Sequence, residues 1–323
     1  MRNLRRRTGK VFYYARNIVR DSAPQLLFRH RLDQALATAI RRGPALLDRL
    51  NYYNKLRDPF TPSPVAVTVA TLPRRPSMYY YDLKEFARYF DADLRLDLEF
   101  GDVRGLPPVP SIVKNRPIGA DNANGVLFKM DKLRHFQLQA DPMRFADKQP
   151  RVVWRGDMNN PMRLVFLDAA QGLPFCDVGS PATHAPERHR KPFMSVEDQK
   201  RYRYIVSLEG YDVATNLKWI MSSNSLCLMP EPTNEIWFCE GHLKPDQHYV
   251  QLAPDFSDIT DKVAFFERHP EQAERIIASA QAYCRQFLDE PTERALCFLV
   301  LYKYFVLSGQ IEPDEKIWRF ISA

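Results

Sequence analysis

Glycine is scarce in this chain, and its spacing excludes two common nucleotide-binding motifs. Only 12 of the 323 residues are glycine; no two lie closer than four residues apart, and none are five apart. A G-x-G-x-x-G dinucleotide fingerprint and a G-x-x-x-x-G-K-[ST] phosphate loop are therefore absent from the sequence. These absences exclude typical dinucleotide-dependent enzymes and P-loop ATPases.

Cysteine pairs and long apolar runs are also lacking. The 5 cysteines are an odd number without C-x-x-C spacing, which argues against a disulfide framework or a zinc ribbon and indicates a reducing cytosol. The longest nearly apolar run, Ala295–Leu307, contains Lys303 and is well short of the ~20 residues that a bilayer span needs. We therefore expect no transmembrane helix. Arg16 and Arg20 interrupt the first apolar stretch, so it does not resemble a secretory signal peptide.

Apolar sequence is sufficient for two cores. Hydrophobic residues make up 45% of the chain and aromatic residues 12%, which excludes disordered and fibrous classes. The length fits two compact lobes. We predict an α/β fold in three parts: a basic N-terminal helical arm over 1–60, an α/β lobe over 61–148, and a second α/β lobe with closing C-terminal helices over 149–323.

Strand and helix patterns alternate in both predicted lobes. Helical patterns are expected at 21–57, 83–90, 161–170, 213–221, 273–287 and 295–306. Strands are expected at 65–70, 95–100, 111–114, 126–130, 152–154, 174–178, 204–208, 225–229 and 248–252. Because repeated β-α-β units build parallel sheets, a ligand is expected at the carboxyl ends of the strands.

The net charge of +7 is concentrated at the N-terminus. Residues 1–20 contain no acid and these cations: Arg2, Arg5, Arg6, Arg7, Lys10, Arg16 and Arg20. Apolar residues such as Val11, Phe12, Ile18 and Val19 are interleaved with them, a pattern that suits an anionic membrane surface. A nucleic acid is the competing polyanion, and a solvated terminus is the third interpretation. We expect the anionic inner-membrane surface and no nucleic acid.

Two segments of the second lobe join a strand end, a turn and a helix start. After 152–154, Arg155, Asp157 and Arg163 bracket a helix start, where two arginines can clamp a diphosphate. After 204–208, backbone amides are expected to hold a phosphate in the segment Tyr211, Asp212, Val213, Ala214, Thr215, Asn216, with Lys218 one turn further. The simpler interpretations are a surface arginine pair beside a core tryptophan and an Asp212 that only caps a helix.

Carboxylates of the first lobe are candidates for acid–base chemistry. Asp102 lies just past the strand expected at 95–100, where a carboxylate can act as a general base or simply cap a turn. Asp91 and Asp93 match the D-x-D of metal-dependent sugar transferases, but they follow a helix pattern, so we interpret the match as chance. His184 and His189 lie in a basic loop that suits solvent better than a metal. We predict no metal site.

Four blocks of the sequence resemble those of a known family. They are VVWRG from Val152, CDVG from Cys176, KRYRYIVSLEGYDVATNLKWIMSSNS from Lys200, and LKPDQHY from Leu243. Together they resemble glycosyltransferase family 90, the CAP10-like group, and within it the bacterial lipopolysaccharide A proteins, over about 75–308. The resemblance implies a GT-B fold with two Rossmann-like lobes, a nucleotide sugar in the C-terminal lobe, and inverting transfer without an essential metal.

The resemblance also implies roles for residues of the second lobe. Arg163 matches a UDP-contacting arginine of eukaryotic members, and Asp157 stands where they have serine. Their second nucleotide block falls on 211–216, where Asn216 replaces an arginine, so Lys218 or Arg155 is the expected substitute. Glu235 and Glu240 are candidates for holding the ribose hydroxyls.

The catalytic base is less directly matched. The family keeps its aspartate in an Arg-Asp-x-Pro loop, whereas this chain has Arg104-Gly-Leu-Pro107, with Gly105 at the position of the acid. We select Asp102, three residues earlier in the same loop, and Asp121 as the next candidate.

The predicted function is transfer of a hexose from a UDP-sugar to a lipopolysaccharide core oligosaccharide, with no cofactor besides the donor. The enzyme is expected to be cytoplasmic and peripheral on the inner membrane. Alternatives within the family are transfer to capsule polysaccharide or to protein. The alternative from a different class is a non-catalytic membrane- or nucleic-acid-binding protein that acts through residues 1–20.

Overall fold

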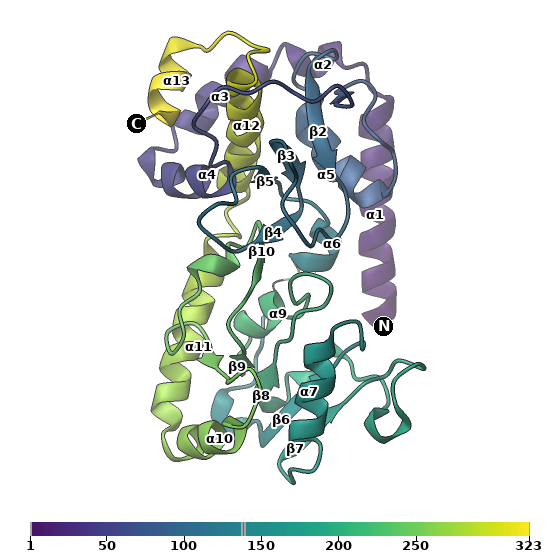
Figure 1. Ribbon diagram of the computed structural model, residues 1–323, viewed down its shortest axis with the longest axis vertical. Helices are drawn as coiled ribbons and strands as arrows, with labels where there is room; N and C mark the ends of the chain where they lie inside the picture. The colour runs from purple at the N-terminus through teal and green to yellow at the C-terminus, as the bar shows by residue number, and fades with distance from the viewer. Residues whose placement is uncertain (1, 137, 139, 323) are drawn as a thin grey trace. The chain divides into compact units, whose positions relative to one another are not determined.

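The protein is described here by a computed structural model covering residues 2–136, 138 and 140–322, with the side chains of the first helix described from Gly9 onward. Two compact units are present, one formed by residues 1–133 with 289–323 and the other by 134–288 (Figure 1). Each unit contains parallel strands and helices, so the predicted α/β class is confirmed. The units differ from the predicted lobes in two places, because residues 134–148 group with the second unit and residues 289–323 with the first.

The first unit is built on a four-stranded sheet in the order β1-β2-β3-β5. Its strands are β1 (Val67–Thr68), β2 (Arg95–Glu99), β3 (Ser111–Val113) and β5 (Gly125–Leu127), and β4 (Asn115–Pro117) follows β3. β2, β3 and β5 are parallel, while β1 pairs antiparallel with β2. The three parallel strands therefore end at one edge of the sheet, which is the edge where α/β proteins bind ligands.

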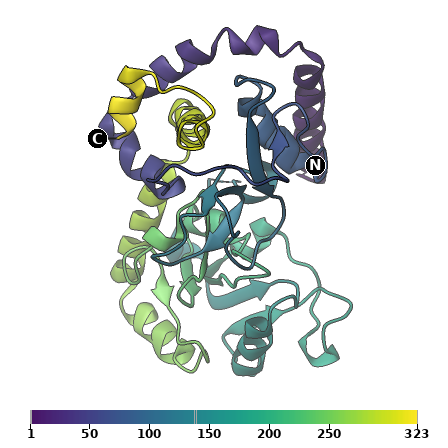
Figure 2. The same ribbon diagram turned by 45° about the horizontal axis from the view of Figure 1, so that its top comes forward.

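The helices of this unit come from both the N-terminal and the C-terminal parts of the chain. They are α1 (Arg2–Ser22), α2 (Leu26–Arg29), α3 (Leu32–Ile40), α4 (Leu47–Tyr53), α5 (Ser77–Ala87), α12 (Glu290–Leu307) and α13 (Glu315–Ile321), with α6 (Lys132–His135) at the unit's end. Figure 2 looks nearly along α12, which has helices of the N-terminal region beside it.

Side chains of α12 explain why the C-terminal helices belong to the first unit. The Tyr304 hydroxyl donates to the Pro110 carbonyl at 2.9 Å and accepts from the Asp97 amide at 3.1 Å, which ties α12 to the sheet. The rings of Phe298 and Phe86 lie 5.2 Å apart between α12 and α5. The apolar stripe at 295–306 was predicted correctly as a helix, but hydrophobic periodicity alone does not say which core a helix joins.

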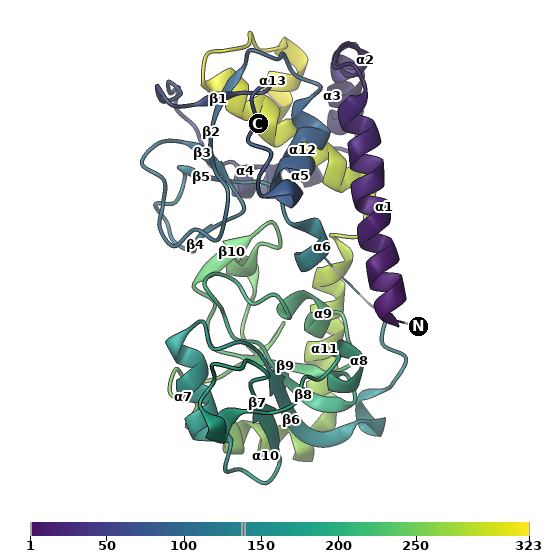
Figure 3. The same cartoon turned by 90° about the vertical axis from the view of Figure 1, so that its right-hand side faces the viewer.

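α1 is a docked helix rather than a separate arm. It runs beside α5 in Figure 3, and the Tyr13 hydroxyl donates to Asp82 on α5 at 2.7 Å. Arg20 forms an ion pair with Glu85 of α5 at 3.0 Å, and Asn17 is buried between these two contacts. The predicted arm over 1–60 is helical, but its residues contribute to the fold of the first unit.

The second unit contains a five-stranded parallel sheet in the order β11-β9-β8-β6-β7. Its strands are β6 (Gln149–Arg155), β7 (Cys176–Gly179), β8 (Tyr202–Val206), β9 (Leu226–Met229) and β11 (Val250–Gln251), and β10 (Asn234–Ile236) lies outside this sheet. Its helices are α7 (Pro161–Ala170), α8 (Val196–Gln199), α9 (Leu217–Met221), α10 (Ile259–Arg268) and α11 (Pro270–Arg285).

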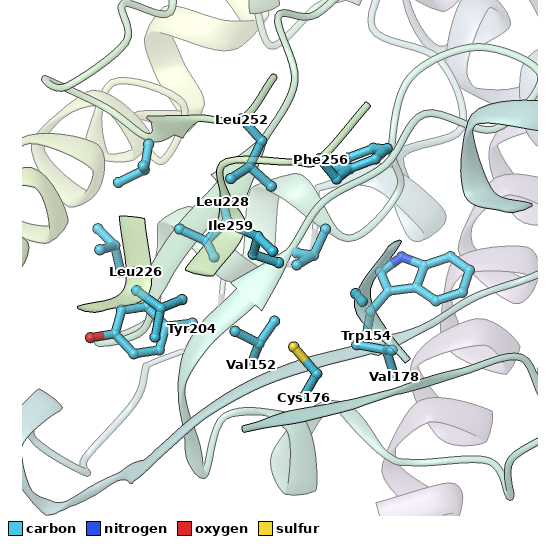
Figure 4. Close-up of a cluster of buried hydrophobic side chains, with 14 of the residues drawn as sticks. Val152, Trp154, Cys176, Val178, Tyr204, Leu226, Leu228, Leu252, Phe256 and Ile259 are labelled. Carbon is cyan, nitrogen blue, oxygen red and sulfur yellow. The ribbon is translucent and has the colours of Figure 1, made fainter. Parts of the chain in front are cut away.

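Helices cover this sheet so that the central strands are buried, as their sequences require. Val152 and Trp154 on β6, Tyr204 on β8 and Leu228 on β9 share one hydrophobic core with α7 and α10 (Figure 4). Buried parallel strands read as continuous apolar runs, which is why β6, β8 and β9 were found from the sequence. Because the strands are buried in this core, polar groups lie in the loops that follow them.

The described residues contain no helix long and apolar enough to cross a bilayer. All five cysteines are buried and carry free thiols.

Candidate active site

The strand order of the second unit reverses between β6 and β8. The chain passes from β6 to β7 on one side of β6, and then continues with β8, β9 and β11 on the other side. In open parallel sheets, ligands bind in the crevice at the carboxyl ends of the two strands that flank such a reversal. The loops that follow β6 and β8, residues 156–160 and 207–216, lie at these strand ends.

Arg163, in the first turn of α7, joins these two loops. Its Nε donates to the Glu209 carbonyl and its Nη2 to the Leu208 carbonyl, both at 2.9 Å. Its Nη1 donates to the Asp157 carbonyl at 2.8 Å, on the loop after β6. Burial lowers the pKa of Arg163 to about 10, with Asp157 opposing the change, so the guanidinium stays charged at neutral pH. Arg163, which the sequence predicts to bind a diphosphate, therefore also holds two loops of the protein together.

Two asparagines and a glycine complete this junction. The Asn160 side chain caps α7 by accepting from the Met162 amide at 2.9 Å, and its Nδ2 donates to the Gly210 carbonyl at 2.9 Å. A side chain at Gly210 would place its Cβ 3.2 Å from Arg163 Nη2 and 3.3 Å from the Asn159 amide. Asn160 thus accepts from two amides at the start of α7, that of Met162 with its side chain and that of Arg163 with its carbonyl, so these two amides already have partners.

Arg155 has a different environment from the one predicted. It forms an ion pair with Asp177 of β7 at 2.7 Å and donates to the Asp177 and Pro192 carbonyls. The Asp177 carboxylate also accepts from Lys191 at 2.9 Å and from the Tyr202 hydroxyl at 2.8 Å. Arg155 thus anchors β6 to β7, and nothing in these contacts points it toward the β8 loop.

Asp157 is exposed and lies 3.0 Å from His184 Nε2. The basic loop of His184 was expected to lie in solvent, but its His189 is buried. Gly156, beside Asp157, packs directly on the core tryptophan, because a Cβ there would lie 2.4 Å from the Trp154 ring. The Trp-Arg-Gly block therefore requires glycine for packing at the end of β6.

The segment 211–216 forms a loop of bends and a turn rather than the first turn of a helix. α9 begins at Leu217, so Asp212 is not its cap and the predicted helix over 213–221 is shorter than expected. Tyr211 is exposed, Asp212, Val213 and Ala214 are buried, and Thr215 is partly buried. Asn216 Nδ2 donates to the Val206 carbonyl and its Oδ1 accepts from Ser207, each at 3.1 Å, which fixes the loop to the end of β8.

A buried ion pair lies behind this loop. Lys218 Nζ is 2.5 Å from Glu240 Oε1, and both side chains are almost completely buried. Glu240 also accepts from the Ile236 amide at 2.8 Å, and burial raises its pKa although Lys218 and this amide oppose the rise. Glu235, the other predicted ribose ligand, is fully buried on β10.

Glu240 also lines a small cavity between the loops that follow β8 and β9. This cavity has a volume of about 20 Å³ and is lined by Ser207, Glu209, Ala214 and Met229 among others. That volume holds about one water molecule, so the cavity is too small to enclose a nucleotide sugar.

In the first unit, Asp102 lies three residues beyond β2 and contacts a buried lysine. Lys114 directly follows β3, its side chain is fully buried, and its Nζ makes an ion pair with Asp102 Oδ1. Asn115 holds the same loop, because its Oδ1 accepts from the Val103 amide at 2.9 Å. The candidate base is therefore fixed at the carboxyl ends of two adjacent parallel strands.

Two more polar residues belong to this cluster. The Tyr79 hydroxyl lies 3.5 Å from Asp102 Oδ1, and burial raises the pKa of Tyr79 to about 12, with Lys114 opposing the rise. Asp131, four residues after β5, is buried, has a positive φ of 55°, and adds to the negative field at Tyr79. A positive φ is uncommon for a non-glycine residue, and aspartate is one of the residue types that adopt it most readily.

Sequence reasoning missed Lys114, Tyr79, Asp131, Asn159 and Asn160. Lys114 ends an apolar strand and Asn160 precedes a proline at a helix start, so those two carried signals that strand ends and capping rules can detect. Asp121, the second candidate base, is exposed in the loop before β5.

Comparison with known proteins identifies the family of the chain. Residues 128–308 match the model for "Glycosyl transferase family 90". The chain is 49% identical over 272 residues to the O-glucosyltransferase LpsA of Dichelobacter nodosus, covering 84% of this chain and 85% of that protein. It is 28% identical over 167 residues to human protein O-glucosyltransferase 3, covering 50% of this chain and 32% of that protein. The chain therefore belongs to glycosyl transferase family 90 and is a glycosyltransferase.

Proposed function

We propose that this enzyme transfers a hexose from a UDP-sugar to a lipopolysaccharide core oligosaccharide, with inversion at the anomeric carbon. The observation that carries the proposal is the 49% identity, over most of both chains, to a protein named O-glucosyltransferase LpsA. That name makes glucose the first donor sugar to test. We further propose a GT-B arrangement, in which the second unit holds the donor and the first supplies the base.

The donor is proposed to bind at the strand reversal between β6 and β8. Arg163 supports this role because it is a partly buried cation whose hydrogen bonds connect the two loops at that point. A positively charged hydrogen-bond donor that is already in place before the reaction stabilises the negative charge that develops on the leaving UDP, and the protein does not have to reorganise. Lys218 and Glu240 lie behind the same loops and support their shape through a buried ion pair.

Asp102 is proposed to act on the acceptor. Its carboxylate takes the proton of the acceptor hydroxyl as that oxygen forms a bond to the anomeric carbon, while the bond from the carbon to the UDP oxygen breaks on the opposite face. The pairing with Lys114 supports this role, because a neighbouring ammonium favours the ionised form of a carboxylate. Attack opposite the leaving group inverts the anomeric centre.

The reaction is proposed to proceed without a metal ion, since Arg163 and backbone amides offer positive charge for the diphosphate. The site of action is proposed to be the cytosolic face of the inner membrane, where a lipid-linked core glycan would be met.

The test is a transfer assay with the full chain. UDP-glucose, UDP-galactose, a GDP-hexose and a CMP-sugar are compared as donors, and purified core oligosaccharide, capsule polysaccharide and an acceptor protein as acceptors. We expect UDP release coupled to a mass increase of one hexose on the core oligosaccharide. Transfer only to capsule or protein would move the proposal to another acceptor, and the absence of any UDP-sugar turnover would contradict it.

A further inference from the structure

The outward face of α1 exposes large apolar side chains. Val11 is 68% exposed, Phe12 69%, Ile18 53% and Val19 72%, and α2 directly after it exposes Leu26 and Leu27. These six residues are among fourteen large hydrophobic side chains exposed in the described part of the chain. Such a concentration within 17 residues is more than the scattered exposure that is normal on soluble proteins.

This apolar face is held outward by the opposite face of the same helix. At 100° per residue, Val11, Ala15 and Ile18 lie on one side of α1, with Phe12 and Val19 next to them. The other side carries the side chains that dock on α5, where Tyr13 bonds to Asp82, Tyr14 lies 3.2 Å from Ser77, and Arg20 pairs with Glu85. The helix therefore cannot rotate its apolar face inward without losing these contacts.

The charged residues of α1 that precede Asp21 are all positive. Lys10 and Arg16 are exposed on α1. The sequence adds Arg2, Arg5, Arg6 and Arg7 to the same helix, whose side chains lie outside the described part, and places no acid before Asp21. An apolar strip with flanking cations matches the boundary between lipid headgroups and acyl chains of an anionic membrane.

We propose that the outward face of α1 lies in the plane of an anionic lipid bilayer, with Val11, Phe12, Ile18 and Val19 inserted at the headgroup boundary. A second copy of this chain is a poorer occupant, because pairing two such faces would bring two sets of like charges together. A nucleic acid would use the cations but would leave the apolar strip in water. The inference goes beyond the transfer chemistry and does not depend on which sugar is moved.

The contacts between α1 and α5 decide which variants can test membrane binding. Deleting residues 1–20 would remove the partners of α5 and uncover Asp82 and Glu85, so loss of binding after deletion would be ambiguous. Substitutions confined to the outward face avoid this, because the side chains concerned are exposed and contribute little to the fold.

The experiment is flotation of the full chain with phosphatidylcholine vesicles that contain about 30% phosphatidylglycerol, whose negative charge should attract the cations of α1. The variant V11S/F12S/I18S/V19S is compared with V65S/F193S, which removes two exposed apolar residues elsewhere. We expect the α1 variant to lose at least about tenfold in vesicle affinity, and the control variant to bind like the wild type. Hexose transfer to a soluble acceptor should be equal in all three proteins.

Insertion is measured directly by the tryptophan fluorescence of Phe12→Trp. The fluorescence of the wild type is subtracted to remove the contribution of the native tryptophans. The fluorescence of the introduced indole should shift to shorter wavelength on adding the anionic vesicles, and the shift should weaken in high salt. Unchanged flotation of the α1 variant, or an unshifted emission of the introduced indole with bound protein, would overturn the proposal. Wild-type dimerisation in solution that the α1 variant abolishes would also overturn it, in favour of a second copy as the occupant.

Discussion

The ammonium group of Lys114, on a fully buried side chain, is paired with the carboxylate of Asp102. Lys114 follows β3 and Asp102 lies beyond β2, so the pair connects the carboxyl ends of two neighbouring parallel strands. A buried cation needs a nearby countercharge, and a general base needs to be ionised. One contact therefore serves both stability and the proposed chemistry, and these two roles have to be separated by experiment.

Replacing Asp102 by asparagine should reduce turnover by about 10² or more, because the base is lost. The affinity for UDP should stay close to that of the wild type, since the donor is proposed to bind the second unit. We expect Tm to fall as well, because Lys114 loses its countercharge. Steady-state kinetics, calorimetric UDP titration and a thermal melt measure the three effects.

The double variant D102N/K114M separates them. Removing both charges should recover much of Tm while leaving turnover as low as in Asp102→Asn. If the double variant regains activity together with stability, Asp102 is only a structural partner of Lys114, and Asp131 becomes the carboxylate to test.

Arg163 gives a second prediction. Arg163→Ala should weaken UDP binding about tenfold or more, since a charge-assisted hydrogen bond contributes about 1.5–3 kcal/mol. Arg163→Lys should also bind poorly, because one ammonium cannot reach the carbonyls of Leu208, Glu209 and Asp157 together. Calorimetry with UDP measures both, and wild-type affinity in Arg163→Ala would remove this residue from the donor site.

Much of the fold was predictable because the buried strands carry their own signal. β6, β8 and β9 are apolar runs, and α7 begins and ends where its sequence predicted, owing to Asn160 as cap and Pro161 at the first position. The elements that were missed are β4, β10, α6, α8, α10 and α13. The assignment of α12 failed for a different reason: its packing on Phe86 and the sheet is a tertiary choice that periodicity does not contain.

The loops of the candidate site could be placed from the sequence at strand ends, but the contacts within them could not. Strand ends identified the loops around Arg163 and Asp102 correctly as neighbours of parallel strands. The pairing of Arg155 with Asp177 was not foreseeable, because Asp177 is 22 residues away on a strand whose neighbour depends on sheet order. The short α9 likewise reflects the side-chain bonds of Asn216, which compete with helix formation at its start.

Chelation should leave hexose transfer intact. In the proposed mechanism, Arg163 and loop amides supply the positive charge that a divalent ion supplies in other transferases. Turnover with EDTA in roughly thousandfold excess over enzyme should therefore match the untreated rate. Loss of activity that Mn²⁺ restores would contradict this and return attention to Asp91 and Asp93.

Acid should destabilise the second unit through Asp177. Burial alone would raise the pKa of this carboxyl, but hydrogen bonds from Arg155, Lys191 and Tyr202 outweigh burial and hold its pKa well below the ordinary value. A depressed pKa stabilises the fold above the unfolded value of about 3.9, and this contribution is lost as the pH falls below it. Asp177→Asn should lower the free energy of unfolding at neutral pH and weaken the pH dependence of that free energy below about pH 4, both measured by urea denaturation. If this variant loses stability in acid as the wild type does, other carboxylates cause the effect.

The last prediction concerns Lys218 and Glu240, which form a nearly inaccessible ion pair behind the loop that follows β8. Removing one partner, in Lys218→Met or Glu240→Gln, should cost about 3–5 kcal/mol, because the other charge is left buried without its countercharge. The double variant K218M/E240Q should cost clearly less than the sum, since the introduced glutamine can still accept from the Ile236 amide and no isolated charge remains.

This double variant also decides what the pair does for the substrate. If Glu240 binds the ribose of the donor, the stabilised double variant should still have weak UDP affinity. If the pair only supports the loop, its UDP affinity should return together with its stability. Urea denaturation gives the coupling energy and calorimetry gives the UDP affinity; additive losses of stability in the three variants would contradict a direct ion pair.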